Sequence, residues 1–164
     1  MHNLVTIVGR PNVGKSTLLN YFLGKKISIT SRKPQTTRHR ILGIKTVDDV
    51  QIAYVDTPGL HSDDRFSHHR HLNRAAQSVF HDVDMVLFVV DVKAWEKEDD
   101  WILEQLKVLP IPVILAVNKI DRMGDQAALL PYMDAVRQRF DFHTIVPISA
   151  KKGDQMLVLE QEIV

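Results

Sequence analysis

Residues 9–16 read Gly-Arg-Pro-Asn-Val-Gly-Lys-Ser, which matches the pattern G-x-x-x-x-G-K-[ST]. Glycines in such a loop allow backbone N–H groups to curl around phosphate oxygens without a Cβ in the way. The lysine adds a positive charge for β- and γ-phosphates, and the serine hydroxyl can ligate Mg2+. We therefore predict a phosphate-binding loop with these contacting residues: Gly9, Asn12, Val13, Gly14, Lys15, Ser16 and Thr17.

The segments on either side of the loop favour a strand followed by a helix. Residues 4–8 form a short apolar run, which is typical of a buried parallel strand. Residues 16–23 have helix-forming character, so the loop would deliver phosphate to the N-terminus of a helix.

The same alternation continues along the chain. We expect further strands at 40–46, 51–55, 85–90, 113–117 and 144–148, and helices at 67–80, 99–109, 126–140 and 155–164. Asp99 or Asp100 is the predicted N-cap of the helix at 99–109. A short turn at 47–50 makes the two strands around it antiparallel. The order predicts an α/β fold, the three-layer sandwich of P-loop NTPases, with a mostly parallel six-stranded sheet, one antiparallel strand and helices on both faces.

Composition narrows the class of protein. The 164 residues suffice for one domain, and the net charge of +1 gives no global attraction to nucleic acid or membrane. The absence of cysteine excludes disulfides and thiolate metal sites. No signal peptide is visible at the N-terminus, and no apolar run approaches the roughly 18–20 residues of a membrane helix. A soluble cytoplasmic protein is the default expectation.

A second phosphate-contacting segment, Asp56-Thr-Pro-Gly59, follows the strand at 51–55. Asp56 can hold Mg2+, usually through water, and Gly59 can offer its N–H to a γ-phosphate without a Cβ clash. The pattern D-x-x-G is weak alone, but its position directly after a strand strengthens the prediction.

Two segments predict which base is bound. Asn118-Lys-Ile-Asp121 closes the strand at 113–117, and Asp121 can accept hydrogen bonds from guanine N1–H and the 2-amino group. Adenine lacks both donors, so it would leave a carboxylate unpaired. Asn118 can tie this segment to the phosphate loop, and the Lys119 stem can cover one face of the base. Ser149, Ala150 and Lys151 follow the last strand, where backbone N–H groups can reach guanine O6.

The polar loop before the second strand contains Gln35-Thr-Thr-Arg-His39. A threonine hydroxyl here can complete the Mg2+ shell only while a γ-phosphate is present, so loss of the phosphate would release the loop. Thr37 is favoured over Thr36, although the residues alone leave the choice open. The metal ligands predicted are therefore Ser16, Thr37 and Asp56, and an ordinary basic solvated loop is the alternative for this segment.

These segments, in this order, resemble a translation-factor-type GTPase, and more closely the Era family. The loop sequence 9–20 is shared with Der- and TrmE-like GTPases, but Gln35-Thr-Thr-Arg-His39 is similar to Era, whereas those relatives carry Gly-Thr-Thr-Arg-Asp. Asp56-Thr-Pro-Gly-Leu-His61 and residues 113–119 also resemble Era. The resemblance implies that residues 1–164 are one GTPase domain, with GTP or GDP and Mg2+ as ligands.

The resemblance also implies a larger protein. Era proteins carry a C-terminal RNA-binding KH domain, which this chain lacks, and its last helical pattern has no stop signal, so we expect a truncation within that helix. The family implies action in small ribosomal subunit assembly and 16S rRNA processing, which is doubtful for this fragment. It also implies peripheral association with the inner face of the cell membrane for the full-length protein, and no DNA partner.

The hydrolytic machinery departs from many small GTPases. Leu60 stands where those enzymes place a water-orienting glutamine, and neither His61 nor any arginine is an obvious replacement. Asn12 matches the loop asparagine that helps K+-dependent relatives bind potassium, although it can equally serve only to shape the loop. The predicted catalytic groups are Lys15, Thr37 and Asn12, with K+ as an additional cofactor. The rival hypothesis is a nucleotide-gated binding switch with negligible turnover.

Overall fold

The computed structural model describes residues 1–24, 40–57 and 80–164. Five of the six strands run parallel, and β2 pairs antiparallel to β3 at one edge, in the order β2-β3-β1-β4-β5-β6. The strands are β1 (His2–Val8), β2 (Ile41–Val47), β3 (Val50–Val55), β4 (Met85–Asp91), β5 (Val113–Asn118) and β6 (Thr144–Pro147). The expected six-stranded sheet with one antiparallel strand is confirmed.

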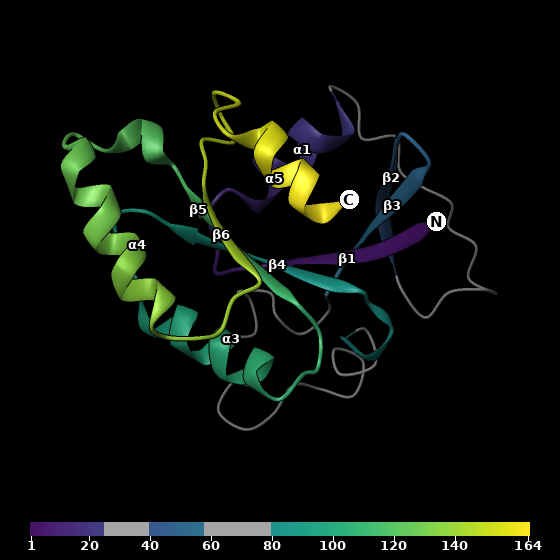
Figure 1. Ribbon diagram of the computed structural model, residues 1–164, viewed down its shortest axis with the longest axis horizontal. Coiled ribbons are helices and arrows are strands. Elements are labelled where there is room, and N and C mark those ends of the chain that lie inside the picture. Colours follow the sequence, from purple (N-terminus) through teal and green to yellow (C-terminus); the bar gives the residue numbers. More distant parts are fainter. Residues whose placement is uncertain (25–39, 58–79) are drawn as a thin grey trace.

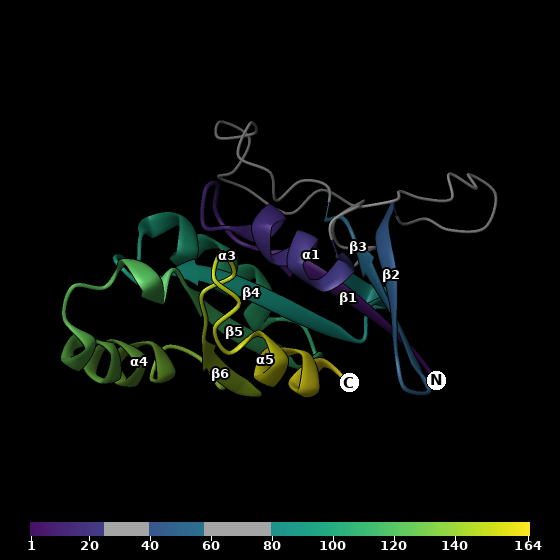
Figure 2. The ribbon, with the colours of Figure 1, turned by 90° about the horizontal axis from the view of Figure 1, so that it is seen from above.

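Helices cover both faces of this sheet, as Figures 1 and 2 show. The helices are α1 (Lys15–Leu23), α3 (Lys97–Lys107), α4 (Leu129–Arg137) and α5 (Met156–Ile163). Helices α1 and α5 pack on one face, and α3 and α4 on the other. The predicted three-layer α/β sandwich is therefore confirmed.

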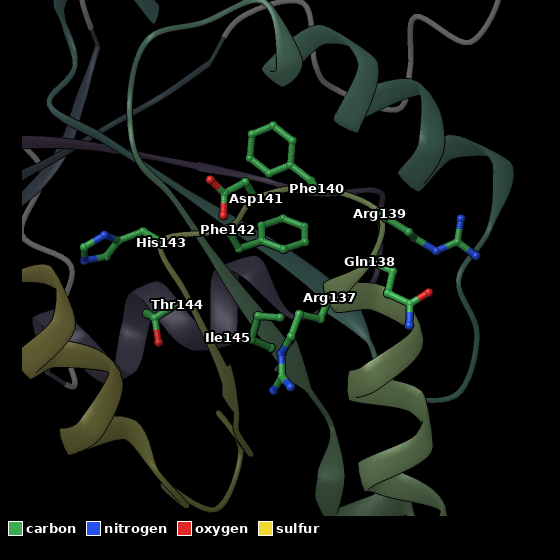
Figure 3. A pocket seen from close by; sticks show the side chains of 9 residues that line it. All are labelled: Arg137, Gln138, Arg139, Phe140, Asp141, Phe142, His143, Thr144 and Ile145. Carbon is green, nitrogen blue, oxygen red and sulfur yellow. The ribbon is translucent and has the colours of Figure 1, made fainter.

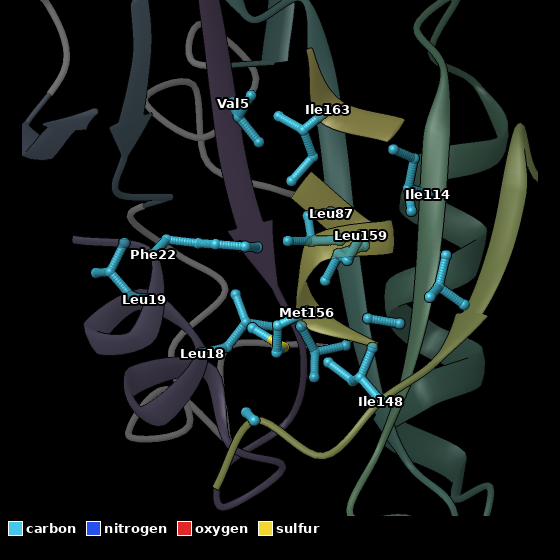
Figure 4. Packing of buried hydrophobic residues seen from close by; sticks show 14 of the residues in the cluster. Val5, Leu18, Leu19, Phe22, Leu87, Ile114, Ile148, Met156, Leu159 and Ile163 are labelled. Carbon is cyan, nitrogen blue, oxygen red and sulfur yellow. The ribbon is translucent and has the colours of Figure 1, made fainter. Parts of the chain in front are cut away.

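Strands β4 and β5 supply both layers of the core because successive side chains point to opposite faces. In β4, Val86, Phe88 and Val90 face α3, whereas Leu87 and Val89 face α1 and α5. Figure 4 shows the second layer, in which Leu18 and Phe22 of α1 meet Met156 and Leu159 of α5 over the sheet. A strand buried on both faces must be apolar throughout, which explains why β4 and β5 are almost continuous apolar runs.

Two predicted helices have boundaries that differ from the structure by two or more residues. Helix α3 begins two residues earlier than expected, and its N-cap is Glu96 rather than Asp99 or Asp100. Asp99 occupies the third helical position and closes a capping box with Glu96. The expected helix at 126–140 is shorter, because a 3-10 helix over Gln126–Ala128 precedes α4 and the α-helix ends at Arg137.

Within the described ranges, none of the helices is both long and apolar enough to cross a membrane. The predicted helix at 67–80 lies outside those ranges except for Phe80, which is buried against the α3 face.

Candidate nucleotide-binding site

Polar residues of the predicted motifs collect at the carboxyl ends of the parallel strands. The phosphate loop follows β1, Asp56 follows β3, Asn118 ends β5, and Ser149 comes shortly after β6. In open α/β sheets, ligands bind in the crevice at this edge. Sequence segments that lie far apart are therefore brought to one edge of the sheet.

The phosphate loop is fastened to the end of β5 by Asn118. The Asn118 Nδ2 group donates to the Val13 carbonyl oxygen at 2.8 Å. Gly14 makes this approach possible: its φ is +105°, and a Cβ there would lie 2.2 Å from Asn118 Nδ2. The predicted tie between Asn118 and the phosphate loop is present, and it requires glycine at position 14.

Lys15 places a half-buried ammonium group inside the loop. Its Nζ donates to the Gly9 carbonyl oxygen and, at 3.3 Å, to that of Arg10. Burial lowers the pKa of Lys15, and the negative charges of Asp56 and Glu98 oppose that shift. The negative charge of phosphate oxygens would offset the cost of this burial and favour the charged ammonium group. The loop therefore presents a cation suited to a phosphate.

Ser16 and Thr17 lie in the first turn of α1, and both side chains are exposed. Helix N-termini direct backbone N–H groups and a partial positive charge outward, which favours phosphate. The Ser16 hydroxyl is exposed, and its role as a metal ligand stays a prediction.

Asp56 is held at the end of β3 by its backbone. Its N–H donates to the Arg40 carbonyl oxygen at 2.8 Å, and its Oδ2 lies 4.0 Å from Arg40 Nη1. The neighbouring Thr57 is buried and shares a hydrogen bond with the Thr6 hydroxyl, which also donates to the Val55 carbonyl oxygen at 3.1 Å. A carboxylate and a serine hydroxyl are hard oxygen donors, which is the ligand chemistry that Mg2+ prefers.

The predicted guanine-contacting segments are joined to each other. Ser149 Oγ donates to Asp121 Oδ1 at 2.8 Å, and the Ala150 N–H donates to Asn118 Oδ1 at 3.0 Å. The Ser149 hydroxyl lowers the pKa of Asp121, so the carboxylate stays ionised and can accept hydrogen bonds from a base. Lys151 follows with an exposed side chain.

Lys119 links the same segment to the phosphate loop a second time. Its Nζ donates to the Asn12 carbonyl oxygen and lies 3.3 Å from Asp91 Oδ2 at the end of β4. Both Asn12 and Lys119 adopt left-handed backbone conformations, with φ of 64° and 72°. Asparagine tolerates this region better than most residues, so Asn12 suits a turn of the loop. A Lys119 stem over the base remains a prediction.

Other predicted site residues lie outside the described residues. They are Thr36 and Thr37 of the polar loop and Gly59, Leu60 and His61 after Asp56. Their placement relative to Ser16 and Asp56 therefore stays a prediction.

Several polar residues at this edge were missed from the sequence. Arg10, Thr6, Asp91 and Asp99 each make a hydrogen bond or ion pair to a motif segment or its neighbour. For Arg10 the sequence offered one indication, which is that it lies inside the predicted phosphate loop, although the pattern accepts any residue at that position. The others showed none, because their partners are distant in sequence.

A hollow of about 590 Å3 lies away from this edge, at the amino end of β6 (Figure 3). Its lining includes Arg137 and Arg139, which pair with Asp134 at 3.3 Å and Asp100 at 3.2 Å. Both cations are thus neutralised by neighbouring carboxylates, and this hollow is not where the predicted nucleotide contacts converge.

Residues 4–119 match the family model described as 50S ribosome-binding GTPase. GTPase Era of Marinobacter nauticus is 55% identical over 159 residues, which cover 97% of this chain and 52% of that protein. GTPase Era of Coxiella burnetii is 52% identical over 157 residues, which cover 96% of this chain and 53% of that protein. The chain thus spans about half the length of these curated relatives.

Solved structures agree in fold. An Aquifex aeolicus Era variant bound to GDP and AlF4- superposes with a TM-score of 0.78 at 38% identity, covering 99% of this chain and 56% of that one. Era in complex with MgGDPNP and nucleotides 1506–1542 of 16S ribosomal RNA gives a TM-score of 0.78 at 40% identity, covering 99% and 55%.

The sheet order, the loop between β1 and α1 and the matching family model define a P-loop GTPase domain. Within that class, the identity to the curated relatives is decisive. This chain belongs to the Era family of GTPases.

Proposed function

We propose that this domain binds GTP together with Mg2+ and hydrolyses it to GDP and phosphate. The observation that carries the proposal is the position of Asn118, whose side chain bonds Val13 of the phosphate loop at 2.8 Å and Ala150 of the predicted guanine segment at 3.0 Å. One side chain thus couples the phosphate-contacting and base-contacting segments. The relatives bound to GDP with AlF4- and to MgGDPNP support the same ligand class.

The chain's own residues would divide the phosphate and metal contacts. Lys15 and the backbone N–H groups of residues 9–17 would bind the β- and γ-phosphates, with Gly59 adding an N–H to the γ-phosphate. Ser16 and Asp56, with Thr37, would hold Mg2+. Bound Mg2+ supplies charge neutralisation on the phosphate oxygens during transfer.

The base contacts follow from the geometry at the other end. Asp121 would accept the guanine N1–H and 2-amino hydrogens, held in place by Ser149. Backbone N–H groups of residues 149–151 would donate to guanine O6, and Lys119 would cover one face of the ring. Adenine has neither donor and would make no hydrogen bond to the Asp121 carboxylate, so GTP is preferred over ATP.

Hydrolysis by this domain is expected to be slow, since Leu60 cannot orient a water molecule. The catalytic groups proposed are Lys15, Thr37 and Asn12, with K+ bound near Asn12 compensating charge that develops between the β- and γ-phosphates. Phosphate release from GTP should therefore be faster in K+ than in Na+ at equal ionic strength. Lys15→Ala serves as the inactive control.

The second candidate function is a nucleotide-gated binding switch with negligible turnover, which the leucine at position 60 favours. Stimulation by K+ supports the autonomous enzyme. Tight binding of GTP and GDP with slow turnover that ignores the cation supports the switch. Absence of guanine-nucleotide binding contradicts both.

For the whole protein, we propose a cytoplasmic role in small ribosomal subunit assembly. Support comes from a relative solved with nucleotides 1506–1542 of 16S ribosomal RNA. Because this chain spans about half of its relatives, the proposal is tested with full-length protein: 30S binding should depend on GTP and should be lost in Lys15→Ala.

A further inference from the structure

The Arg10 side chain leaves the phosphate loop and lies along the segment that leads into α3. Its Nε donates to Asp99 Oδ2 at 3.1 Å, and its Nη2 donates to the Ala94 carbonyl oxygen at 2.9 Å. Its Nη1 lies 3.6 Å from Glu96 Oε2. Only 13% of the side chain is exposed. The guanidinium is therefore anchored at three points, all outside the loop that carries it.

Its main partner is an unusually placed carboxylate. Asp99 is completely buried, and its Oδ2 accepts both Arg10 Nε and, at 2.8 Å, the Glu96 N–H. Among the described residues, Asp99 Oδ1 has no hydrogen-bond partner. Burial raises the pKa of Asp99, while the Glu96 N–H and Arg10 oppose that shift.

Burying this carboxylate is costly, and helix capping does not require it. An acidic residue at the third helical position can close a capping box while exposed to water. Removing a carboxylate from water is unfavourable unless it is paired and hydrogen-bonded. Arg10 is the cation that pairs with Asp99, so the burial is explained by the link to the phosphate loop rather than by the start of α3.

The backbone of Arg10 completes the connection. Its carbonyl oxygen accepts Lys15 Nζ at 3.3 Å, next to the Gly9 carbonyl oxygen that accepts the same ammonium. One residue thus contacts α3 through its side chain and the predicted phosphate-binding lysine through its backbone.

We propose that Arg10 is a positioning residue, whose contacts with Asp99 and Ala94 hold the phosphate loop in the shape that binds the phosphates of a nucleotide. The inference rests on the proposed function and adds that phosphate affinity depends on the N-terminal end of α3. Arginine suits this role because its planar fork donates in several directions, whereas a lysine ammonium is a single point charge.

The test compares release of fluorescent GDP from the native chain with release from Arg10→Met, Arg10→Lys, Asp99→Asn and the double variant Arg10→Met/Asp99→Asn. Each Arg10 variant should release GDP about tenfold faster or more. The double variant should release GDP no faster than the faster of its two single variants, because both changes break the same contact. Competition by GMP, which lacks the β-phosphate, is measured in parallel. The GDP-to-GMP affinity ratio should fall about tenfold in Arg10→Met, because the contact positions the loop around the phosphates.

The matched control is the exposed pair Arg139 and Asp100, one residue along α3, whose contact joins α3 to the segment after α4. Arg139→Met and Asp100→Asn should leave GDP release within about twofold of native. If circular dichroism shows that Arg10→Met is unfolded, the rate of GDP release from Arg10→Lys tests the proposal instead. That variant keeps the positive charge beside Asp99.

GDP release unchanged in a folded Arg10 variant would overturn the inference while leaving the proposed function intact. An equal loss of GDP and GMP affinity would also overturn it, because general destabilisation weakens both alike. A native chain that binds no guanine nucleotide would overturn the proposed function and this inference together.

Discussion

The phosphate end and the guanine end of the site are built differently. The phosphate loop is fastened by long-range contacts from other elements: Asn118 to Val13, Lys119 to Asn12, and Arg10 to Asp99. At the guanine end, Asp121 accepts a hydrogen bond at 2.8 Å from Ser149, a residue of the other predicted guanine-contacting segment. Phosphate binding therefore depends on how several elements pack, whereas base choice depends on the Asp121 carboxylate and its immediate partner.

The largest expected effect comes from removing the charge at the phosphate end. Lys15→Ala should weaken GDP binding about a hundredfold or more, because charge-assisted contacts to phosphate oxygens are lost. Titration calorimetry measures this, with Lys107→Ala on the exposed side of α3 as the control. Similar GDP affinity in Lys15→Ala and the control would contradict the assignment of residues 9–17 as the phosphate-binding loop.

The next largest effect is expected at Asn118, whose side chain bonds both the phosphate loop and the guanine segment. Asn118→Ala leaves the Val13 carbonyl and the Ala150 N–H without this partner, and both bonds are buried. The free energy of unfolding should fall by about 2–3 kcal/mol, measured by urea denaturation without nucleotide. Asn20→Ala, on the exposed side of α1, should change it by less than about 0.5 kcal/mol. Equal stability of the two variants would mean that Asn118 does not join the two ends.

A change at the guanine end should alter base choice and leave phosphate contacts intact. Asp121→Asn should shift preference from GTP toward xanthosine triphosphate by about tenfold or more, because the amide can donate to the xanthine 2-oxygen. The measurement is competition between the two nucleotides for native and variant protein. An unshifted preference would contradict the assignment of Asp121 to the base.

The smallest effect tests the support of that carboxylate. Ser149→Ala removes the hydroxyl that lowers the pKa of Asp121 below its ordinary value of 3.8. Guanine binding needs the ionised carboxylate and is lost as pH falls through that pKa, so the variant should begin to lose GDP affinity at a higher pH than native protein. At neutral pH the loss should be only about threefold.

GDP titrations from about pH 3 to roughly pH 7 test this prediction, because they cover the range in which Asp121 gains its proton. Identical pH profiles for native and Ser149→Ala protein would show that the hydroxyl does not support Asp121.

Much of the fold was predictable because it follows from local pattern. Apolar runs predicted all six strands to within two residues at each end, since β4 and β5 are buried on both faces and must be apolar throughout. The turn at Asp48 follows from a short polar segment between two strands, and its left-handed φ of 51° is tolerated by aspartate.

The site was predictable only where a contact lies within a known pattern. The bond from Asn118 to the phosphate loop was predicted, since both segments belong to motifs. The contact between Arg10 and Asp99 was not, because it joins residues 89 apart through a buried carboxylate that sequence cannot distinguish from an exposed cap. For the same reason, the sequence predicted Asp99 or Asp100 as the N-cap of α3, whereas the structure has Glu96 in that position.

The most direct test of the account is calorimetric titration of the native chain with GDP and, separately, with ADP in the presence of Mg2+. We predict that GDP binds about a hundredfold more tightly than ADP, or better, because adenine cannot donate a hydrogen bond to Asp121. Equal affinity for the two nucleotides would contradict the guanine assignment, and binding of neither would contradict the site as a whole.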